Sequence, residues 1–419
     1  MNDNQHIPSG YKPSPLGPIP EDWEVKRLGE VFTFKNGVNA GKDSYGEGVR
    51  FVNTMDVLNN EYITGKILRG RVAINEKTKN EFLVSFGDVL FNRTSETREE
   101  VGCSTVYLDN EDAVFGGFVI RAHDIDAIIL NPRFKQYCFQ PSYIRNQISA
   151  LGNGAIRYNL GQEDLSKVNL LIPTKVEQEA IVSVISLWDT AIAKQTALIG
   201  QLTLRKRGLM QQLLTGKKRL KGFSGEWKEV RLGEVGKFAG GCAFNEQEQG
   251  GHTGIPFYKV SDMNLSGNES KMNIANNYVT HEQIERLGYI VIEDEAIIFA
   301  KVGAAIALER KRYAKNFIID NNMLAYIPSN NVWFMKYWFD SISLSKYIQV
   351  GALPSYNASD LSIIKLKMPS LKEQHAIASV LVNADKEIEI QKQKLAAMQE
   401  QKKGLMQVLL TGKKRITTI

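Results

Sequence analysis

Cysteine is scarce in this sequence of 419 residues, and the three cysteines present (Cys103, Cys138 and Cys242) show no C-x-x-C spacing. An odd number of isolated cysteines supports neither a disulfide framework nor a thiolate zinc site, so we expect a reducing, cytoplasmic environment. The five histidines are scattered, and none forms a pair at metal-ligand spacing. The sequence therefore predicts no metal site.

Long hydrophobic runs are also missing. The longest apolar run, residues 296–308, is short and is interrupted by Lys301. The first 20 residues are polar and proline-rich, and they lack the basic-then-apolar pattern of a secretion signal. We therefore expect neither a membrane span nor a secretion leader.

Neither sign of charge dominates. Lys and Arg number 52 against 46 Asp and Glu, which gives a formal net charge of +6. This mild excess of positive charge suits a polyanionic partner. Hydrophobic residues make up 43% of the chain, which is enough at this length to bury a sizeable core in two or three domains.

Catalytic and nucleotide-binding motifs are lacking as well. Residues 37–43 (GVNAGKD) resemble a phosphate-binding P-loop, but they are one residue short between the glycines and carry Asp43 where a Ser or Thr is needed. Residues 152–157 (GNGAIR) begin with Gly-x-Gly but precede no convincing helix. The Asn-Pro-Pro-Tyr or Asp-Pro-Pro-Tyr motif of amino-methyltransferases does not occur. We predict a chain that catalyses nothing by itself.

What the sequence does contain is an internal repeat. Residues 208–219 (GLMQQLLTGKKR) return as residues 404–415 (GLMQVLLTGKKR), an offset of 196 with one mismatch. Residues 23–31 (WEVKRLGEV) return as residues 227–235 (WKEVRLGEV) at an offset of 204. Such a repeat fixes the architecture before any local propensity does. Each half consists of a variable block followed by a well-repeated block.

The two variable blocks match only faintly. Gly48, Phe51 and Asp56 correspond to Gly254, Phe257 and Asp262, residues 89–93 resemble residues 297–301, and Tyr158–Asn159 resemble Tyr356–Asn357. Short β-rich runs at residues 51–52, 87–92, 114–121, 289–301 and 317–326 alternate with Gly/Asn/Asp-rich turns. Helical stretches are predicted at residues 132–147 and 332–347, where clustered aromatic side chains indicate a core. Both blocks therefore predict one α+β fold carrying two different surfaces.

The repeated blocks have helix periodicity and end at a glycine. The predicted stripe comprises Ile181, Val184, Trp188, Gln195, Leu202 and Leu209, and then Ile377, Val380, Ile388, Gln391, Met398 and Leu405. A helix of about 40 residues is about 60 Å long and can act as a spacer. We expect the two helices to form an antiparallel coiled coil about a pseudo-twofold axis, with Gln195 and Gln391 near its centre. The alternative is two ordinary helices, each packed on its own domain.

These features divide the chain into six parts. They are an N-terminal extension (1–20), a first variable block (21–172), a central helical spacer (173–216), a second variable block (221–368), a C-terminal helical spacer (369–412) and a basic tail (413–419).

Basic side chains on turns are the candidates for contacts with nucleic acid. They are Lys35, Lys42, Arg50, Arg69, Arg71, Arg93 and Arg98 in the first block, and Lys259, Lys271, Lys301, Arg310, Lys311 and Arg312 in the second. Arg93 and Lys301 are the most specific of these candidates, because they follow equivalent apolar runs in the two blocks. The polar residues Asn36, Asn39, Asn92, Thr94 and Ser95 would recognise bases beside them. A solvated surface charge is the simpler interpretation of any one of these residues.

The arrangement resembles the specificity subunit of type I restriction-modification systems. Residues 173–181 (PTKVEQEAI) and 369–377 (PSLKEQHAI) open the two repeated helices, and L-L-T-G-K-K-R closes both. The resemblance covers residues 23–415 and includes the Trp and Arg-Leu-Gly-Glu opening of each variable block.

The resemblance implies two target-recognition domains, each recognising one half of a split double-stranded DNA sequence, and two helices that fix the gap between the halves. Two modification subunits would dock on the repeated regions, supply S-adenosylmethionine and flip out an adenine for methylation. Restriction subunits with ATP-driven translocase and nuclease activity would join them, so S-adenosylmethionine, ATP and Mg²⁺ are expected on partners and no cofactor on this chain. The family does not identify which side chains contact bases.

Two other classes of function stay open. The chain could be a scaffold that does not bind DNA, in which the coiled coil pairs two protein-binding lobes, or a fused enzyme that methylates DNA alone. A DNA reader loses affinity for duplex steeply as salt rises, whereas a protein scaffold does not bind it. Methyl transfer by the purified chain would favour the enzyme.

Overall fold

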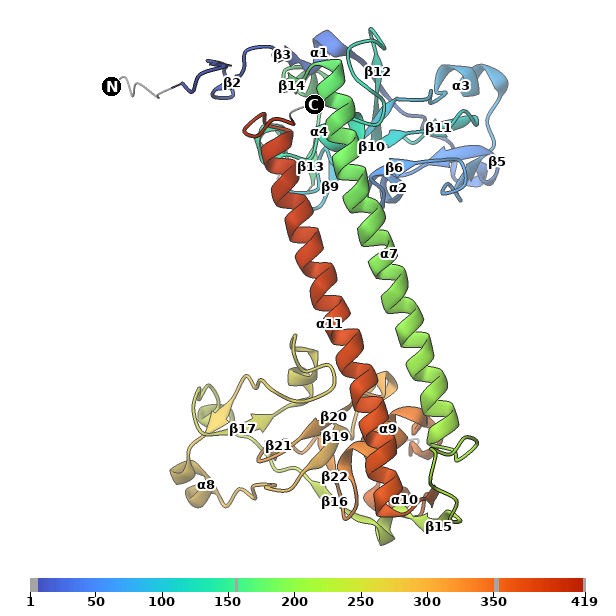
Figure 1. Cartoon of the computed structure of the whole chain (residues 1–419), viewed down its shortest axis with the longest axis vertical. Coiled ribbons are helices and arrows are strands. Elements are labelled where there is room, and N and C mark those ends of the chain that lie inside the picture. Colours follow the sequence, from blue (N-terminus) through green and yellow to red (C-terminus); the bar gives the residue numbers. More distant parts are fainter. Residues whose placement is uncertain (1–6, 155–156, 350–353, 417–419) are drawn as a thin grey trace. The chain divides into compact units, whose positions relative to one another are not determined.

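The structure, a computed structural model, describes residues 7–154, 157–349 and 354–416. The chain forms two compact units (Figure 1). The first contains the residues up to Gln195 together with those from Lys394 onward, and the second spans Thr196–Gln393. Each unit therefore contains one variable block and one half of each long helix.

The first unit is built on a five-stranded sheet of order β4-β12-β8-β10-β6, in which only the β10–β6 pair is parallel. Its strands are β1 (Tyr11–Lys12), β2 (Ile19–Pro20), β3 (Glu24–Arg27), β4 (Phe32–Asn36), β5 (Tyr45–Val52), β6 (Tyr62–Ile63), β7 (Arg71–Val72), β8 (Val89–Asn92), β9 (Thr94–Ser95), β10 (Ser104–Tyr107), β11 (Ala113–Phe115), β12 (Val119–Asp124), β13 (Tyr158–Asn159) and β14 (Asn169–Ile172). Its short helices are α1 (Leu28–Val31), η1 (Lys42–Ser44), α2 (Thr54–Asn59), α3 (Glu76–Glu81), α4 (Lys135–Cys138), α5 (Ser142–Leu151) and α6 (Gln162–Ser166).

The second unit repeats this plan with a four-stranded antiparallel sheet of order β16-β22-β19-β20. Its strands are β15 (Lys228–Arg231), β16 (Gly236–Gly240), β17 (Ile255–Tyr258), β18 (Tyr278–Val279), β19 (Ala296–Ala300), β20 (Lys311–Ala314), β21 (Ile318–Ile319), β22 (Met323–Pro328) and β23 (Lys365–Met368). Its short helices are η2 (Leu232–Glu234), η3 (Glu246–Glu248), η4 (Val260–Asn264), α8 (His281–Leu287), η5 (Ala304–Leu308), α9 (Val332–Ser341), η6 (Ser345–Tyr347) and α10 (Ala358–Ser362).

Each unit also has a small sheet in which two strands run parallel. In the first unit β5 pairs with β11 and β7, and in the second β17 pairs with β21 and β18. The central strands β8 and β19 are buried along their whole length, which explains why they appear in the sequence as continuous apolar runs. The prediction of one α+β fold in two copies is confirmed.

The aromatic clusters predicted to be core are buried. Phe134, Tyr137 and Phe139 in the first unit are at most 2% exposed. The predicted helix over residues 132–147 is wrong in its continuity, because α4 ends at Cys138 and α5 starts after Pro141, whose missing amide hydrogen and fixed φ interrupt a helix.

The long helices α7 (Lys175–Leu213) and α11 (Leu371–Leu409) contain 39 residues each. The repeated motifs account for both ends. Thr174 and Ser370 precede the helices, and their hydroxyls accept hydrogen bonds from the amides of Glu177 and Glu373 (3.4 Å in both cases).

At the other end of each helix a glycine stops the chain. Gly216 and Gly412 both have φ of +69°, the left-handed conformation that a glycine adopts without strain. Beyond them the amides of Lys218 and Lys414 return to carbonyl oxygens of the last helical turn, 3.1 Å away in both cases. The T-G-K-K motif is therefore a helix stop signal.

In each unit the two long helices run antiparallel. Residues near the start of α7 contact residues near the end of α11 in the first unit, and the reverse holds in the second. All twelve residues of the predicted stripe are buried or half-buried. Ile181 and Ile377, however, belong to the cores of their units, so the helix ends pack on the domains as well as on each other. The position of Gln195 relative to Gln391 stays a prediction.

In the part of the chain that the structure describes, no helix combines the length and the apolar character required to cross a membrane. Within the same residues, no group of three or more His, Cys, Asp or Glu side chains is placed to hold a metal ion.

Candidate nucleic-acid interface

A buried carboxylate at the start of α7 binds side chains from both ends of the first unit's sequence. Glu177 is 6% exposed and accepts a hydrogen bond from the indole of Trp23 (Nε1–Oε2 2.7 Å). Arg415, which follows α11, donates to both oxygens of the same carboxylate (3.1 and 2.8 Å) and also pairs with Asp22 (2.7 Å). The hydrogen bonds to Glu177 and Asp22 raise the pKa of the Arg415 guanidinium. We call Trp23, Glu177 and Arg415 the first closure network.

The second unit contains the same network at repeat-equivalent positions. Glu373, at the start of α11, is 1% exposed and accepts from Trp227 Nε1 (3.3 Å). Arg219, which follows α7, binds its carboxylate in a bidentate manner (2.6 and 2.7 Å). An arginine in the basic segment after each long helix therefore binds a glutamate at the start of the other long helix. The most strongly repeated motifs of the sequence form the frame of the molecule.

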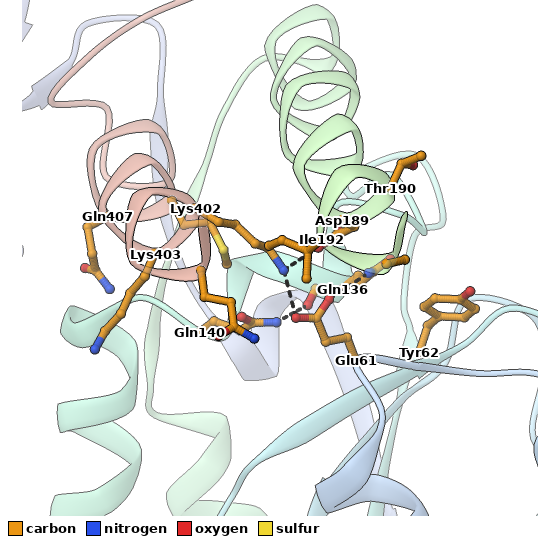
Figure 2. A pocket seen from close by; sticks show the side chains of 13 residues that line it. Glu61, Tyr62, Gln136, Gln140, Asp189, Thr190, Ile192, Lys402, Lys403 and Gln407 are labelled. Atoms are coloured by element: carbon orange, nitrogen blue, oxygen red, sulfur yellow. Dashed lines mark hydrogen bonds and ion pairs between the residues drawn. The ribbon is translucent and has the colours of Figure 1, made fainter. Parts of the chain in front are cut away.

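Further along the helices, α4 and α9 are joined to the long helices by a tyrosine. In the first unit the Tyr137 hydroxyl donates to Asp189 Oδ2 (2.6 Å), and Lys402 pairs with Asp189 (2.5 Å) and with Glu61 (2.9 Å). Figure 2 shows the Lys402 ammonium between these two carboxylates, with Gln136 bonded to Glu61. Burial lowers the pKa of Lys402, but the hydrogen bonds to Asp189 and Glu61 outweigh it, so the pKa lies above its ordinary value.

The second unit repeats the central part of this arrangement. Tyr337 donates to Asp385 (2.6 Å), and Lys206 pairs with Asp385 (2.5 Å). Lys336, on α9, stands where Gln136 stands in the first unit, and it pairs with Asp340. Burial lowers the pKa of Lys336. The two units thus share a frame and differ in the charges beside it.

A groove lies beside Lys402 in the first unit and beside Lys206 in the second. In the first unit the groove has a volume of about 820 Å³ and is lined by side chains of both long helices and of the variable block (Figure 2), with Gln399, Lys402, Lys403, Met406 and Gln407 contributed by α11. In the second unit a groove of about 400 Å³ is lined by the repeat-equivalent residues Thr203, Lys206, Arg207, Met210 and Gln211.

Arg93 and Lys301 occupy the same place in their units, as the sequence predicts. Each follows the buried central strand, and each carbonyl oxygen accepts a hydrogen bond, from the amide of Leu160 in the first unit and of Tyr356 in the second (2.9 Å in both). The side chains of Arg93 and Lys301 are half-buried. The Arg93 guanidinium donates to the carbonyl oxygen of Gly117 (3.2 Å).

These bonds correct one predicted correspondence. The sequence pairs Tyr158 with Tyr356, but Tyr356 occupies the place of Leu160. Both Leu160 and Tyr356 are buried and precede α6 and α10, so the shared Tyr-Asn dipeptide is coincidental. The pairing of Asp56 with Asp262, in contrast, is confirmed, because each accepts a hydrogen bond from the backbone amide at the start of its own turn of helix.

Five of the other basic candidates fall into two groups. Lys42 and Arg98 are exposed, and Arg98 lies over the ring of Tyr158 (5.3 Å). Three are engaged by side chains of their own unit: Lys35 with Glu81 (3.0 Å), Arg50 with Glu111, and Lys259 with Gln249 (3.2 Å). Contact with nucleic acid would have to compete with these partners.

Three candidates lie in the interior instead. Lys311 is 3% exposed and its ammonium pairs with Glu309 (3.3 Å), so the structure does not support it as a nucleic-acid contact. Asn92 and Ser95, expected to recognise bases, are also buried. Asn92 ends a strand that is buried along its whole length, and the strands that carry Ser95 and Lys311 have too few residues to show an alternation of buried and exposed positions.

The networks around Glu177 and Glu373 and those around Lys402 and Lys206 contain residues that the sequence prediction did not single out. Lys206 and Lys402 recur at the offset of 196, as Glu177 and Glu373 do. Their recurrence was the available signal, but a repeated charge on a helix ordinarily indicates a solvated face. Their burial depends on side chains from the variable blocks, which differ in sequence.

Comparison with known proteins gives a family. The model described as "Type I restriction modification DNA specificity domain" matches residues 20–204 and again residues 224–400. A putative type I restriction enzyme MjaX specificity subunit from Methanocaldococcus jannaschii is 25% identical, with 97% of each chain covered. The MjaVIII specificity subunit of the same organism is 23% identical, over 96% of this chain and 95% of the relative.

Solved structures show the same fold. The S subunit of a type I restriction-modification system from M. genitalium superposes with a TM-score of 0.51 at 16% identity, covering 100% of this chain and 99% of that one. A chain from a structure of type I restriction-modification complex assembly and conformational transition gives a TM-score of 0.62 at 17% identity, covering 94% and 99%.

Proposed function

Because this chain belongs to the family of type I restriction-modification DNA specificity proteins, we propose that it recognises a bipartite duplex DNA sequence, with one half-site for each variable block. The observation that carries the proposal is the equivalence of Arg93 and Lys301. Two copies of one fold carry a basic residue at the same backbone position, in blocks whose sequences differ. A shared scaffold with different surfaces suits two different half-sites.

The long helices set the distance between the half-sites in this proposal. Each is a continuous helix of 39 residues that belongs to both units. A helix rises about 1.5 Å per residue and duplex DNA about 3.4 Å per base pair, so the helix length can specify a number of base pairs.

The partners would be two modification subunits. Support comes from the grooves beside Lys402 and Lys206, because repeat-equivalent side chains line them in both units. Two equivalent surfaces suit two copies of one partner. Restriction subunits would join this complex.

The chemistry would belong to these partners. S-adenosylmethionine would be bound by the modification subunits, and ATP and Mg²⁺ by the restriction subunits, with an adenine flipped out of the duplex for methylation. The relatives are named specificity subunits, which suits a chain without catalytic activity.

Mapping methylated adenines tests the proposal. DNA incubated with this chain, its modification subunits and S-adenosylmethionine should carry methylated adenines in one split sequence with a constant gap. A continuous target, or methylation at unrelated sequences, would contradict the assignment of one half-site to each block.

A further inference from the structure

The turn between β11 and β12 exposes an aromatic ring. Phe118 is 61% exposed, whereas Gly117 and Val119 on either side of it are buried. A single exposed apolar side chain is common on protein surfaces and is no evidence of function by itself. Phe118 is distinguished by how its backbone is fixed and by the residue that occupies its place in the second unit.

The backbone of this turn is held from two sides. The Gly117 amide donates to the carbonyl oxygen of Val38 (2.9 Å), and the Phe118 carbonyl oxygen accepts from the Arg93 amide (2.8 Å). The Arg93 guanidinium also donates to the Gly117 carbonyl oxygen (3.2 Å). The ring therefore projects from a fixed turn, so binding would order only its two side-chain torsions.

Two polar side chains lie against the backbone of the same turn, at Gly117. A Cβ atom added at Gly117 would lie 1.9 Å from Asn39 Oδ1, so the Asn39 amide packs directly on the turn. Arg93 packs there through its guanidinium. One turn thus carries an exposed apolar ring and has an amide and a cation packed on its backbone, and these are side-chain types that proteins use on base edges in the major groove.

The second unit shows that the fold does not need the ring. The Lys301 amide donates to the Asn322 carbonyl oxygen (2.7 Å), the bond that Arg93 makes to Phe118. Asn322 therefore occupies the place of Phe118, and its side chain is exposed as well. The same turn is built with an aromatic residue in one copy and an amide in the other, so the phenyl ring has no role in forming the turn.

We propose that Phe118 is a specificity-determining residue for the first half-site, where its ring contacts the C5-methyl group of a thymine. Apolar contact with this methyl group distinguishes thymine from the other bases in the major groove. Asn322, which can only form hydrogen bonds there, gives the second half-site a different preference. The inference rests on the proposed function, because it requires that the first unit contacts DNA bases.

The test uses the chain assembled with its modification subunits and duplexes that carry the mapped target. Phe118→Ala and Phe118→Asn should each weaken binding at least about fivefold, because burial of the apolar ring against the methyl group is lost. The slope of affinity against salt should stay unchanged, because no phosphate contact is removed. Phe118→Leu, which stays apolar, should recover part of the loss. Phe86→Ala removes another exposed phenylalanine (51%) of the same unit and should bind as the wild type does.

Replacing thymines of the first half-site one at a time by deoxyuridine removes the methyl group alone. One position should weaken wild-type binding and leave Phe118→Ala binding unchanged. The inference is overturned if Phe118→Ala binds within twofold of the wild type, or if every replacement affects both proteins equally. If the wild type itself does not bind the split target, the proposed function fails before any variant is compared.

Discussion

At the scale of single residues, the equivalence of Arg93 and Lys301 predicts separable effects. Arg93→Ala should weaken binding about tenfold to duplexes that retain only the first half-site, and Lys301→Ala should do the same for the second, because each side chain follows the central strand of its own unit. Titration of each variant against two duplexes, each with one half-site scrambled, measures this.

The control is Lys167→Ala, which removes an exposed lysine of the first unit that pairs with Asp164. It should leave both affinities unchanged. Equal loss of both half-sites in the Arg93 and Lys301 variants would show that the units do not act separately.

The network of Tyr137, Asp189 and Lys402 predicts loss of stability in alkali. Burial, followed by the hydrogen bond to Asp189, raises the pKa of Tyr137 above its ordinary value of 10.0, and the carboxylates raise that of Lys402 above 10.5. A group whose pKa is higher in the folded state stabilises fully below its unfolded pKa and loses that contribution as pH rises through the folded pKa. The free energy of unfolding should therefore fall above about pH 10.

Tyr137→Phe tests the assignment. It should lower the free energy of unfolding by about 1 kcal/mol at pH 8, through the lost hydrogen bond, and make the decrease above pH 10 shallower. Denaturant titrations of the full chain at pH 8 and pH 11 measure both. Tyr45→Phe, which alters an exposed tyrosine, should keep the wild-type profile. A Tyr137→Phe profile as steep as that of the wild type would rule the tyrosine out as a cause.

Residue-scale sequence analysis succeeded where the backbone environment repeats and failed where burial decides. Arg93 and Lys301 could be matched because a buried apolar strand precedes both. Lys311 could not be recognised as an interior residue, because Glu309, its partner, lies on the same turn and a charged pair there usually points to solvent. Side-chain pairing across a fold requires the tertiary structure.

At the scale of elements, the long helices should determine the spacing of the target. The pairs Asp189–Lys402 and Asp385–Lys206 hold the helices together in the two units. Seven residues inserted into α7 between residues 190 and 205, matched by seven into α11 between residues 386 and 401, leave both pairs intact. Two helical turns add about 10 Å, so the gap in the methylated sequence should grow by about three base pairs.

Insertion into α7 alone is the comparison. It shifts one helix relative to the other, so the two ion pairs are no longer in register, and it should lower the thermal stability of the chain. An unchanged gap in the doubly lengthened protein would remove the spacer role from the helices while leaving the identity of each half-site unaffected.

The helices themselves could be predicted almost to the residue, because a proline, a Thr or Ser cap and a closing glycine mark both ends. The expected coiled coil describes only part of how the long helices pack. The stripe residues Ile181 and Ile377 are buried in the cores of the units, and Leu198, which has stripe spacing, is 39% exposed. Periodicity identifies the apolar face of a helix but not the element that covers it.

At the scale of the whole molecule, the repeat predicts two recognition domains on one chain, and the proposed function assigns the chemistry to partner subunits. The purified chain should incorporate no label from S-adenosylmethionine into DNA that carries its target, and addition of the modification subunit should restore incorporation. The chain alone should still bind duplex, with an affinity that falls steeply as salt rises, because lysine and arginine contacts release counterions from the phosphates. Label transferred by the chain alone would make it an enzyme, whereas binding insensitive to salt would favour a protein scaffold. The salt slope reports which part of the basic side chains behind the net charge of +6 contacts DNA. Cations that face DNA contribute to the slope, whereas internally paired ones such as Lys402 and Lys311 do not.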